Sequence, residues 1–103
     1  MASALQNDIR DFLKPLCQWI FVTTAGRLPG ARKYKLGPKG FPDIMAMTKR
    51  GQIMFIEVKG SSDRNRPDQI EFIKWHQEHG HHAIIAHSID EVISAMHDWG
   101  MIA

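Results

Sequence analysis

Apolar residues form two kinds of pattern along this chain, and each pattern predicts a different element. Near the beginning, four apolar side chains recur every three or four residues, as on one face of a helix: Leu5, Ile9, Phe12 and Leu13. This spacing predicts a helix over residues 3–14, which ends close to Pro15. Runs rich in β-branched, aromatic and other apolar residues predict strands in the second half of 16–25, over 43–48, over 52–59 and over 82–87.

Two further helices are predicted from the residues that begin and end them. Pro67 suits the first position of a helix that runs to about His79, and Gly80 ends it. Ser88 and Glu91 have the spacing of a capping box and begin a last helix near the C-terminus. The order of helix, strand, loop, two strands, helix, strand and helix predicts an α/β fold around one mixed sheet.

Length and composition narrow the class of protein. With 103 residues, 44% hydrophobic and 23% charged, the chain has the size and composition of one globular domain, which we expect to span residues 1–103. It contains no apolar run of the ~20 residues that a membrane-spanning helix needs, and its first residues lack the layout of a secretory signal. The single cysteine, Cys17, excludes an internal disulfide, fits a reducing compartment and is expected to be a buried packing residue.

Basic residues are concentrated in one segment, although the formal net charge is only +2. Between Arg27 and Arg66, ten basic residues accompany three acidic ones, which gives this segment a charge of +7 and leaves −5 for the rest of the chain. Five of the ten lie in residues 26–40, a stretch rich in glycine and proline that predicts a long loop with a short strand around Tyr34. The asymmetry suggests a side that faces a polyanion, although solvated loops are also rich in Lys and Arg.

The predicted hairpin of residues 43–59 brings acidic side chains together. Lys49-Arg50-Gly51 fits a three-residue loop with glycine in the left-handed region. In the resulting register Asp43 lies opposite Glu57, and Lys59 lies on the same face because side chains alternate along a strand. A two-residue loop would shift the register by one residue and send the carboxylates to opposite faces.

Two carboxylates at this spacing repel each other unless a cation lies between them. A hard divalent ion such as Mg²⁺ or Mn²⁺ suits their oxygen atoms. A protonated Lys59 is no metal ligand, but its ammonium group can hold a water molecule or neutralise the charge of a phosphate. The alternative is an ion-pair triad in which Lys59 bridges both acids and no metal is bound.

The wider arrangement of these residues resembles a known family. The resemblance rests on Gly40-Phe41-Pro42-Asp43, on Ile56-Glu57-Val58-Lys59, on Gln69, on the helix 67–79 with Gly80, and on the strand 82–87, in this order. Together they resemble the VRR-NUC domain, the virus-type replication-repair branch of the PD-(D/E)XK nuclease superfamily. The resemblance implies a restriction-endonuclease-like α-β-β-β-α-β core, whose mixed sheet is flanked by helices, with an extra C-terminal helix here.

The resemblance also implies metal-dependent hydrolysis of DNA phosphodiester bonds. Asp43, Glu57 and the carbonyl of Val58 match the groups that hold Mg²⁺ or Mn²⁺ in the family. Lys59 matches the lysine that orients the water nucleophile, and Gln69 matches the glutamine of the helix behind the site. The bound ion would polarise the scissile phosphate and lower the pKa of its water.

One position departs from the family pattern. The family usually places a glutamate on the first helix, three residues before an isoleucine, and Gln6 stands there in this chain. A neutral glutamine is a weak ligand, which puts a second metal ion in doubt. The competing interpretations are therefore a DNA-binding module with an inactive site, or a purely structural cluster in an interaction protein.

The basic segment supplies the expected DNA contacts, since phosphate contacts give affinity without base recognition. The residues expected to make them are Arg27, Arg32, Lys33, Lys35, Lys39, Arg64 and Arg66. Stand-alone members of the family are thought to act as symmetric homodimers on branched DNA, so the resemblance implies a homodimer with four-way junctions as a substrate. It also implies a role in DNA repair in the cytoplasm of a bacterial or phage-infected host cell.

Two other residue types invite alternatives. His76, His79, His81 and His82 lie close together in the sequence and raise the possibility of zinc, but zinc sites usually draw on more distant segments and on cysteine. The three tryptophans are expected in the core or at an interface rather than as platforms for stacking bases: Trp19, Trp75 and Trp99.

Overall fold

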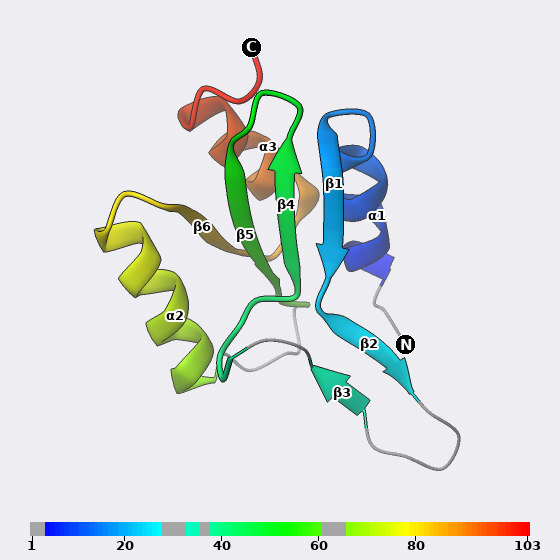
Figure 1. The fold of residues 1–103 in the computed structure, drawn as a ribbon, viewed down its shortest axis with the longest axis vertical. Helices are drawn as coiled ribbons and strands as arrows, with labels where there is room; N and C mark the ends of the chain where they lie inside the picture. The colour runs from blue at the N-terminus through cyan, green and yellow to red at the C-terminus, as the bar shows by residue number, and fades with distance from the viewer. Residues whose placement is uncertain (1–3, 28–32, 36–37, 61–65) are drawn as a thin grey trace.

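The computed structural model describes residues 4–27, 33–35, 38–60 and 66–103, with the backbone alone for 24–27 and 33–35. These residues form helices and strands in the following order (Figure 1): α1 Ala4–Leu13, β1 Cys17–Val22, β2 Thr24–Arg27, β3 Lys33–Lys35, β4 Ile44–Thr48, β5 Ile53–Val58, α2 Pro67–Glu78, β6 His82–Ala86 and α3 Ile89–Asp98.

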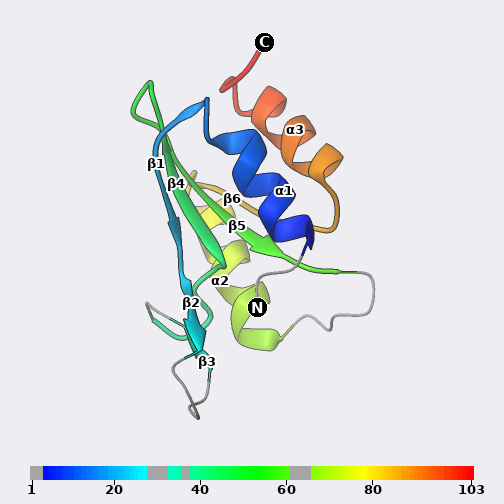
Figure 2. The ribbon, with the colours of Figure 1, turned by 90° about the vertical axis from the view of Figure 1, so that its right-hand side faces the viewer.

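The larger of the two described sheets is mixed. Its strand order is β1-β4-β5-β6, and neighbouring strands are antiparallel except for β5 and β6, which are parallel. A parallel pair needs a crossover connection, which α2 provides. Helices α1 and α3 lie on one side of this sheet (Figure 2). Helix α2 lies on the other side, because Phe72 contacts Phe55, whose side chain points away from that of the core residue Ile56. The predicted α/β fold with a mixed sheet flanked by helices is confirmed.

The main hydrophobic core lies between the sheet and helices α1 and α3. Ile9 and Leu13 of α1 and Met96 of α3 are fully buried there, as the apolar stripe of α1 predicts. They pack against the buried side chains of the central strands: Ile44, Ala46, Met54 and Ile56. Cys17 belongs to the same cluster, and burial raises the pKa of its thiol, which fits the predicted packing role.

The other face of the sheet is covered only in part. Helix α2 packs on β5 and β6, where it contacts Phe55. The cross-strand register places Trp19 and Phe21 of β1 on the same face as Phe55, and they are 39% and 42% exposed. Trp19 and Trp75 of α2, which is 50% exposed, therefore lie outside the core, so that of the two predicted positions an interface remains for them. Trp99 packs against the core, as predicted.

The β4–β5 hairpin has the predicted register. Gly51 has a φ of +87°, the left-handed conformation that a three-residue loop with glycine at its end requires. The Thr48 N–H donates to the Gln52 carbonyl at 2.8 Å and closes the loop. Met45 pairs with Phe55, and the paired ladder ends at Ile44 and Ile56. Continuing this register by one residue places Asp43 opposite Glu57.

The stretch predicted as a long loop contains regular structure. Strands β2 and β3 form a separate two-stranded antiparallel sheet, in which the predicted short strand around Tyr34 is β3. The predicted strand within 16–25 is divided at Thr23, where the chain leaves the larger sheet. The Thr23 N–H donates to the Asp43 carbonyl at 2.8 Å, and the Thr23 hydroxyl donates to the Pro42 carbonyl. These hydrogen bonds join the end of β1 to the segment before β4, where the chain enters and leaves the β2–β3 sheet.

The helix ends follow their sequence signals, with one correction. Helix α2 begins at Pro67, and Gly80 follows its end with a φ of +79°. At α3, the Ser88 hydroxyl accepts the Glu91 N–H at 3.2 Å, as a capping box requires. The Glu91 carboxylate, however, accepts the N–H of His87 rather than that of Ser88. The reciprocal half of the predicted capping box therefore lies one residue further toward the N-terminus. In the part of the chain that the structure describes, no helix is long and apolar enough to cross a lipid bilayer.

Candidate active site

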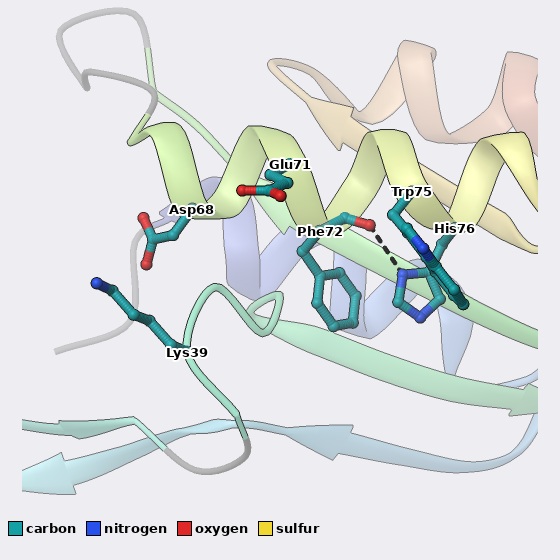
Figure 3. Close-up of a pocket in the computed structure, with 6 residues that line it drawn as sticks. All are labelled: Lys39, Asp68, Glu71, Phe72, Trp75 and His76. Carbon is teal, nitrogen blue, oxygen red and sulfur yellow. Dashed lines mark hydrogen bonds between the residues drawn. The ribbon is translucent and has the colours of Figure 1, made fainter.

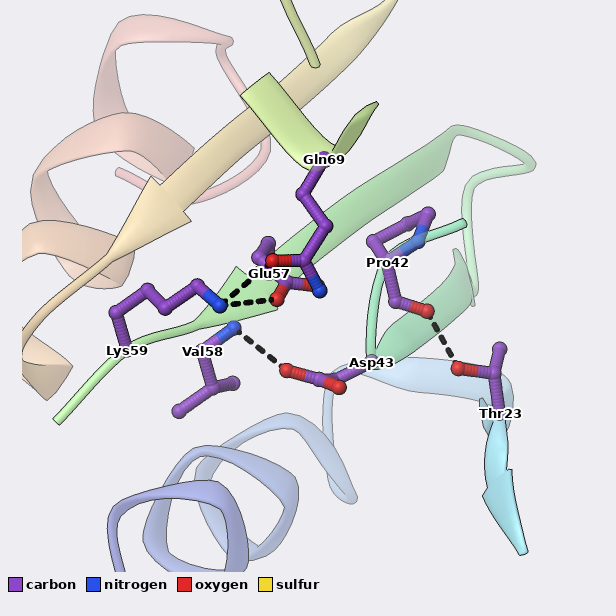
Figure 4. A network of polar contacts seen from close by, with 7 residues as sticks. All are labelled: Thr23, Pro42, Asp43, Glu57, Val58, Lys59 and Gln69. Carbon is purple, nitrogen blue, oxygen red and sulfur yellow. Dashed lines mark hydrogen bonds and ion pairs between the residues drawn. The ribbon is translucent and has the colours of Figure 1, made fainter. Parts of the chain in front are cut away.

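Asp43 is held at the end of the β4–β5 ladder by hydrogen bonds to its backbone and to its side chain. Its carbonyl accepts the Thr23 N–H, so the backbone at this position is fixed against β1. Its carboxylate accepts the N–H of Val58 at 3.0 Å, and therefore lies across the end of β5 (Figure 4). Asp43 is half-buried, which leaves part of its surface open to solvent.

Glu57 and Lys59 form a buried ion pair beside Asp43. The Lys59 Nζ lies 3.1 Å from the Glu57 carboxylate, and the two residues are 7% and 1% exposed. The Lys59 backbone N–H donates to the Ala86 carbonyl of β6 at 2.9 Å, which fixes the position of Lys59 just beyond β5. The predicted common face of Glu57 and Lys59 is consistent with this contact.

Gln69 closes the network from α2. The Lys59 Nζ donates to the Gln69 Oε1 at 2.7 Å, and Gln69 is only 7% exposed. Figure 4 shows Glu57, Lys59 and Gln69 converging from β5 and α2, with the Asp43 carboxylate at the neighbouring Val58 amide. The alternative from the sequence was an ion-pair triad of Lys59 with both acids. The structure adds two contacts to it: Lys59 donates to the Gln69 amide oxygen, and the Asp43 carboxylate accepts the Val58 N–H.

The burial of this ion pair has an energetic consequence. Removing two charges from water costs several kcal/mol per ion, and their attraction offsets that cost only when further hydrogen bonds satisfy both groups. Lys59 has such a bond to Gln69, but an apolar pair of similar volume would stabilise the sheet at least as well. Stability alone therefore gives little reason to place Glu57 and Lys59 here.

The donor groups at this site fit a hard divalent cation. Asp43 and Glu57 would contribute carboxylate oxygens, and Val58 would contribute its main-chain carbonyl, which are the oxygen ligands that such ions prefer. Among the described residues, no three His, Cys, Asp or Glu side chains are grouped so that they could hold a metal. A cation here would therefore complete its coordination with the carbonyl and with oxygens of water or substrate. Gln6, at the position that the resemblance gives to a glutamate, is buried on α1.

The predicted DNA-contacting residues are not all described to the same extent. Lys39 and Arg66 are exposed, and Arg66 precedes the first turn of α2. Arg27 belongs to β2, and Lys33 and Lys35 belong to β3. In Figure 1 these two strands lie beyond the end of the larger sheet at which β4 begins and β5 ends. Arg32 and Arg64 lie outside the described residues.

The histidines considered for zinc take part in ring stacking and helix hydrogen bonds. The His76 Nδ1 bonds to the Phe72 carbonyl at 2.8 Å, and the His79 Nδ1 bonds to the Trp75 carbonyl at 2.7 Å. The His79 ring stacks on Trp75 with centroids 3.9 Å apart. These contacts place the two rings on aromatic neighbours within α2.

Two residues that position the site were not identified from the sequence. Thr23 fixes Pro42 and Asp43 through hydrogen bonds, but a threonine at the end of an apolar run carries no local signal of that role. Gly40 packs against α2: a Cβ on Gly40 would lie 2.4 Å from the Asp68 carbonyl oxygen. Its φ of +81° gives a second reason for glycine, and the Gly40-Phe41-Pro42-Asp43 stretch was the available signal.

The fold is therefore a mixed sheet flanked by helices, with an acidic pair and a lysine at the end of its central strands. The family model of the VRR-NUC domain matches residues 3–90, so this chain belongs to the VRR-NUC domain family. A solved structure described as a VRR_NUC domain is similar in fold, with a TM-score of 0.65, 19% sequence identity and 90% of each chain covered. The comparison with curated proteins found no match.

Proposed function

We propose that this protein is a Mg²⁺- or Mn²⁺-dependent DNA endonuclease that hydrolyses phosphodiester bonds. The observation that carries the proposal is the buried Lys59, held by Glu57 and Gln69, with the Asp43 carboxylate at the neighbouring Val58 amide. Membership of the VRR-NUC family supports DNA as the substrate. The Lys59 ammonium group supplies a positive charge for a phosphate, and the carboxylates of Asp43 and Glu57 supply oxygen ligands for a divalent ion.

Each residue has a distinct role in this proposal. Asp43, Glu57 and the Val58 carbonyl would hold the ion, which when bound polarises the phosphate and acidifies a water molecule. Lys59 orients the attacking water, and its positive charge opposes the negative charge that develops on the phosphate oxygens. Gln69 is a positioning residue, because its hydrogen bond fixes the direction of the Lys59 ammonium group.

The basic segment provides the DNA-binding surface in this proposal. Lys39 and Arg66 flank the first turn of α2, and Lys33 and Lys35 extend the positive charge along β3. Contacts of this kind bind the backbone of any sequence, which fits an enzyme that selects the shape of its substrate, such as flaps and four-way junctions. A role in DNA repair in the cytoplasm of a bacterial or phage-infected cell belongs to the same proposal.

We further propose a homodimer. The uncovered face of the larger sheet exposes Trp19 and Phe21, together with Ile53, which is 37% exposed. An apolar face of this kind is typical of a surface that a partner covers. A dimer with two-fold symmetry would also present two sites to the two arms of a branched DNA.

A second candidate function rests on Gln6. A neutral glutamine at the family's glutamate position weakens the ligand set, and a DNA-binding module with an inactive site would bind DNA without cleaving it. The two functions differ in one property, which is cleavage that depends on a divalent ion.

The test is an assay of the purified protein on linear duplex, flap and four-way-junction DNA, with Mg²⁺, with Mn²⁺ and with a chelator. We expect cleavage only with the ions, and a loss of at least ~100-fold in Asp43→Asn and in Lys59→Met. Asp98→Asn, at the exposed end of α3, is the matched control and should keep full activity. DNA binding without cleavage by the unaltered protein would select the second function, and activity retained in both site variants would exclude the proposed site.

A further inference from the structure

A cavity lies next to the segments that carry the candidate active site, and none of the site residues lines it. It has a volume of about 410 Å³ and lies between α2 and the segment that leads into β4. Its lining residues are Lys39, Asp68, Glu71, Phe72, Trp75 and His76. Figure 3 shows the Lys39 ammonium group and the Asp68 carboxylate at one end and the three rings toward the other.

The aromatic end of this cavity is built for a flat apolar ligand. Trp75 is 50% exposed although it is one of the largest apolar side chains of the molecule. The His79 ring stacks on the indole of Trp75 at 3.9 Å and 19°, and the His76 ring meets it edge-to-face at 4.9 Å. These contacts restrict the plane of Trp75, while half of its surface stays open to a ligand. Phe72 and His76 stack on each other with centroids 4.0 Å apart and form the adjoining wall.

The polar end of the cavity selects among flat ligands. The carboxylates of Asp68 and Glu71 accept hydrogen bonds and repel phosphate, so they suit the N–H groups on the edge of a nucleobase. Lys39 supplies the one positive charge among the lining residues, which suits the phosphate attached to that base. A base within a duplex has both faces stacked on its neighbours and its Watson–Crick edge paired, so the stacking site of this cavity suits an unpaired nucleotide.

The cavity and the candidate active site share two segments of the chain. Lys39 lines the cavity and Asp43 belongs to the acidic pair, and a chain of four residues spans at most about 14 Å. Asp68 lines the cavity, while the next residue, Gln69, bonds to Lys59. Because Gly40 has no side chain, the segment before β4 can lie close against the Asp68 backbone.

The walls of the cavity are also fixed from behind. Phe41 packs edge-to-face against Phe72 at 5.3 Å and against Phe55 of β5 at 5.8 Å. This triad of rings connects the segment before Asp43, the sheet and α2. A ligand in the cavity is therefore held at a constant distance from the acidic pair, as a nucleotide near the scissile bond would be.

From this geometry we propose that the cavity binds an unpaired nucleobase of the DNA substrate, one to a few nucleotides from the bond that is cut. The base stacks on Trp75, its N–H groups donate to Asp68 or Glu71, and Lys39 contacts its phosphate. The inference rests on the proposed function and specifies its substrate, which is DNA with a single-stranded segment next to a duplex.

The test measures binding with a chelator present, so that no DNA is cut. Fluorescence anisotropy would compare a blunt duplex, the same duplex with a short unpaired tail at either end, and the same tails made of abasic nucleotides. We expect a tail with bases to raise the affinity about tenfold, the scale of one base–aromatic stack, and an abasic tail to lose most of that gain. Trp75→Ala should abolish the gain and leave the affinity for the blunt duplex unchanged.

Matched variants separate the cavity from the rest of α2. Trp75→Phe keeps a ring and should keep most of the gain, and Ile70→Ala, which removes a 41% exposed side chain outside the cavity, should keep all of it. Thermal unfolding of each variant verifies that it is folded. Three results would overturn the inference. They are equal affinities for tailed and blunt DNA, equal affinities for tails with and without bases, and a loss of affinity in Trp75→Ala that is the same for every DNA.

The outcomes for the two proposals are distinguishable. A preference for tailed DNA that depends on Trp75, in a protein that cuts no DNA with Mg²⁺ or Mn²⁺, would support the cavity and reject the endonuclease. Cleavage that depends on the ion, without any effect of an unpaired base, would support the endonuclease and reject the cavity.

Discussion

Lys59 is a buried charge, and its burial has a cost to stability. It is 7% exposed, and its ammonium group meets the carboxylate of Glu57 at 3.1 Å and the Gln69 amide oxygen at 2.7 Å. A buried charge of this kind is tolerated because both partners are present together. The cost to stability and the proposed catalytic role therefore concern the same atoms.

This arrangement predicts a strongly non-additive pair of substitutions. Glu57→Ala leaves the buried ammonium group without its counter-charge and should lower the free energy of unfolding by about 3–5 kcal/mol. Adding Lys59→Met removes the charge that was left and should recover most of the loss. Urea unfolding at neutral pH measures both effects, and a single-variant loss below about 1 kcal/mol would show that water reaches the ion pair.

At the scale of elements, the N-terminus of α3 shows how one side chain connects a strand to a helix. Glu91 lies in the first turn of α3, and its carboxylate accepts the His87 N–H just after β6. That hydrogen bond, with the nearby His87 ring, lowers the pKa of Glu91 below its ordinary value of 4.5. The Ser88 hydroxyl caps the same helix by accepting the Glu91 N–H.

The lowered pKa predicts a dependence of stability on pH. A carboxylate with a depressed pKa in the folded state contributes stability above its ordinary pKa and loses it as the pH falls through the folded value. Glu91→Gln should therefore lower the free energy of unfolding at neutral pH and have no such effect well below pH 4, as measured by urea unfolding across that range. The exposed Asp90→Asn, in the same turn, is the control. An equal loss at both pH values would show that the charge of Glu91 is not involved.

At the scale of the whole molecule, the larger sheet is covered unequally. Helices α1 and α3 enclose one face (Figure 2), and the contacts of α2 with β5 and β6 cover part of the other. In the β1–β4 part of that face, the side chains of Trp19 and Phe21 are about two-fifths exposed. This unequal cover is the structural basis of the proposed homodimer.

The proposed homodimer predicts a change of mass in a specific variant. The chain has a mass of 11.8 kDa, and light scattering should find about twice this value for the unaltered protein. Replacing Trp19 and Phe21 by glutamate places charges on the uncovered face and should yield the monomer mass, because buried like charges oppose association. Trp75→Ala, on α2, should leave the dimer intact. A monomer mass for the unaltered protein would remove the homodimer from the proposal.

The register of the hairpin shows what local sequence can specify. The Lys49-Arg50-Gly51 loop fixes the pairing because only glycine adopts a φ of +87° without strain, and the pairing then places Asp43 opposite Glu57. Pro67 and Gly80 are local signals of the same type, and the helix limits that they predict are confirmed. The roles of the acidic pair, of Lys59 and of Gln69, and the single domain over 1–103, stay predictions.

The remaining features depend on segments that are distant in the sequence. The sequence by itself determined the turns, the helix ends and the strand pairing across one short loop, since backbone sterics and hydrogen bonds within a few residues decide them. Only the tertiary structure decided the hydrogen bonds of Thr23 to the segment before β4, the meeting of Lys59 with Gln69, and the exposure of Trp19 and Trp75. These depend on which surfaces the elements cover, and packing among distant residues sets that, whereas hydrophobic periodicity specifies only the face that each element turns inward.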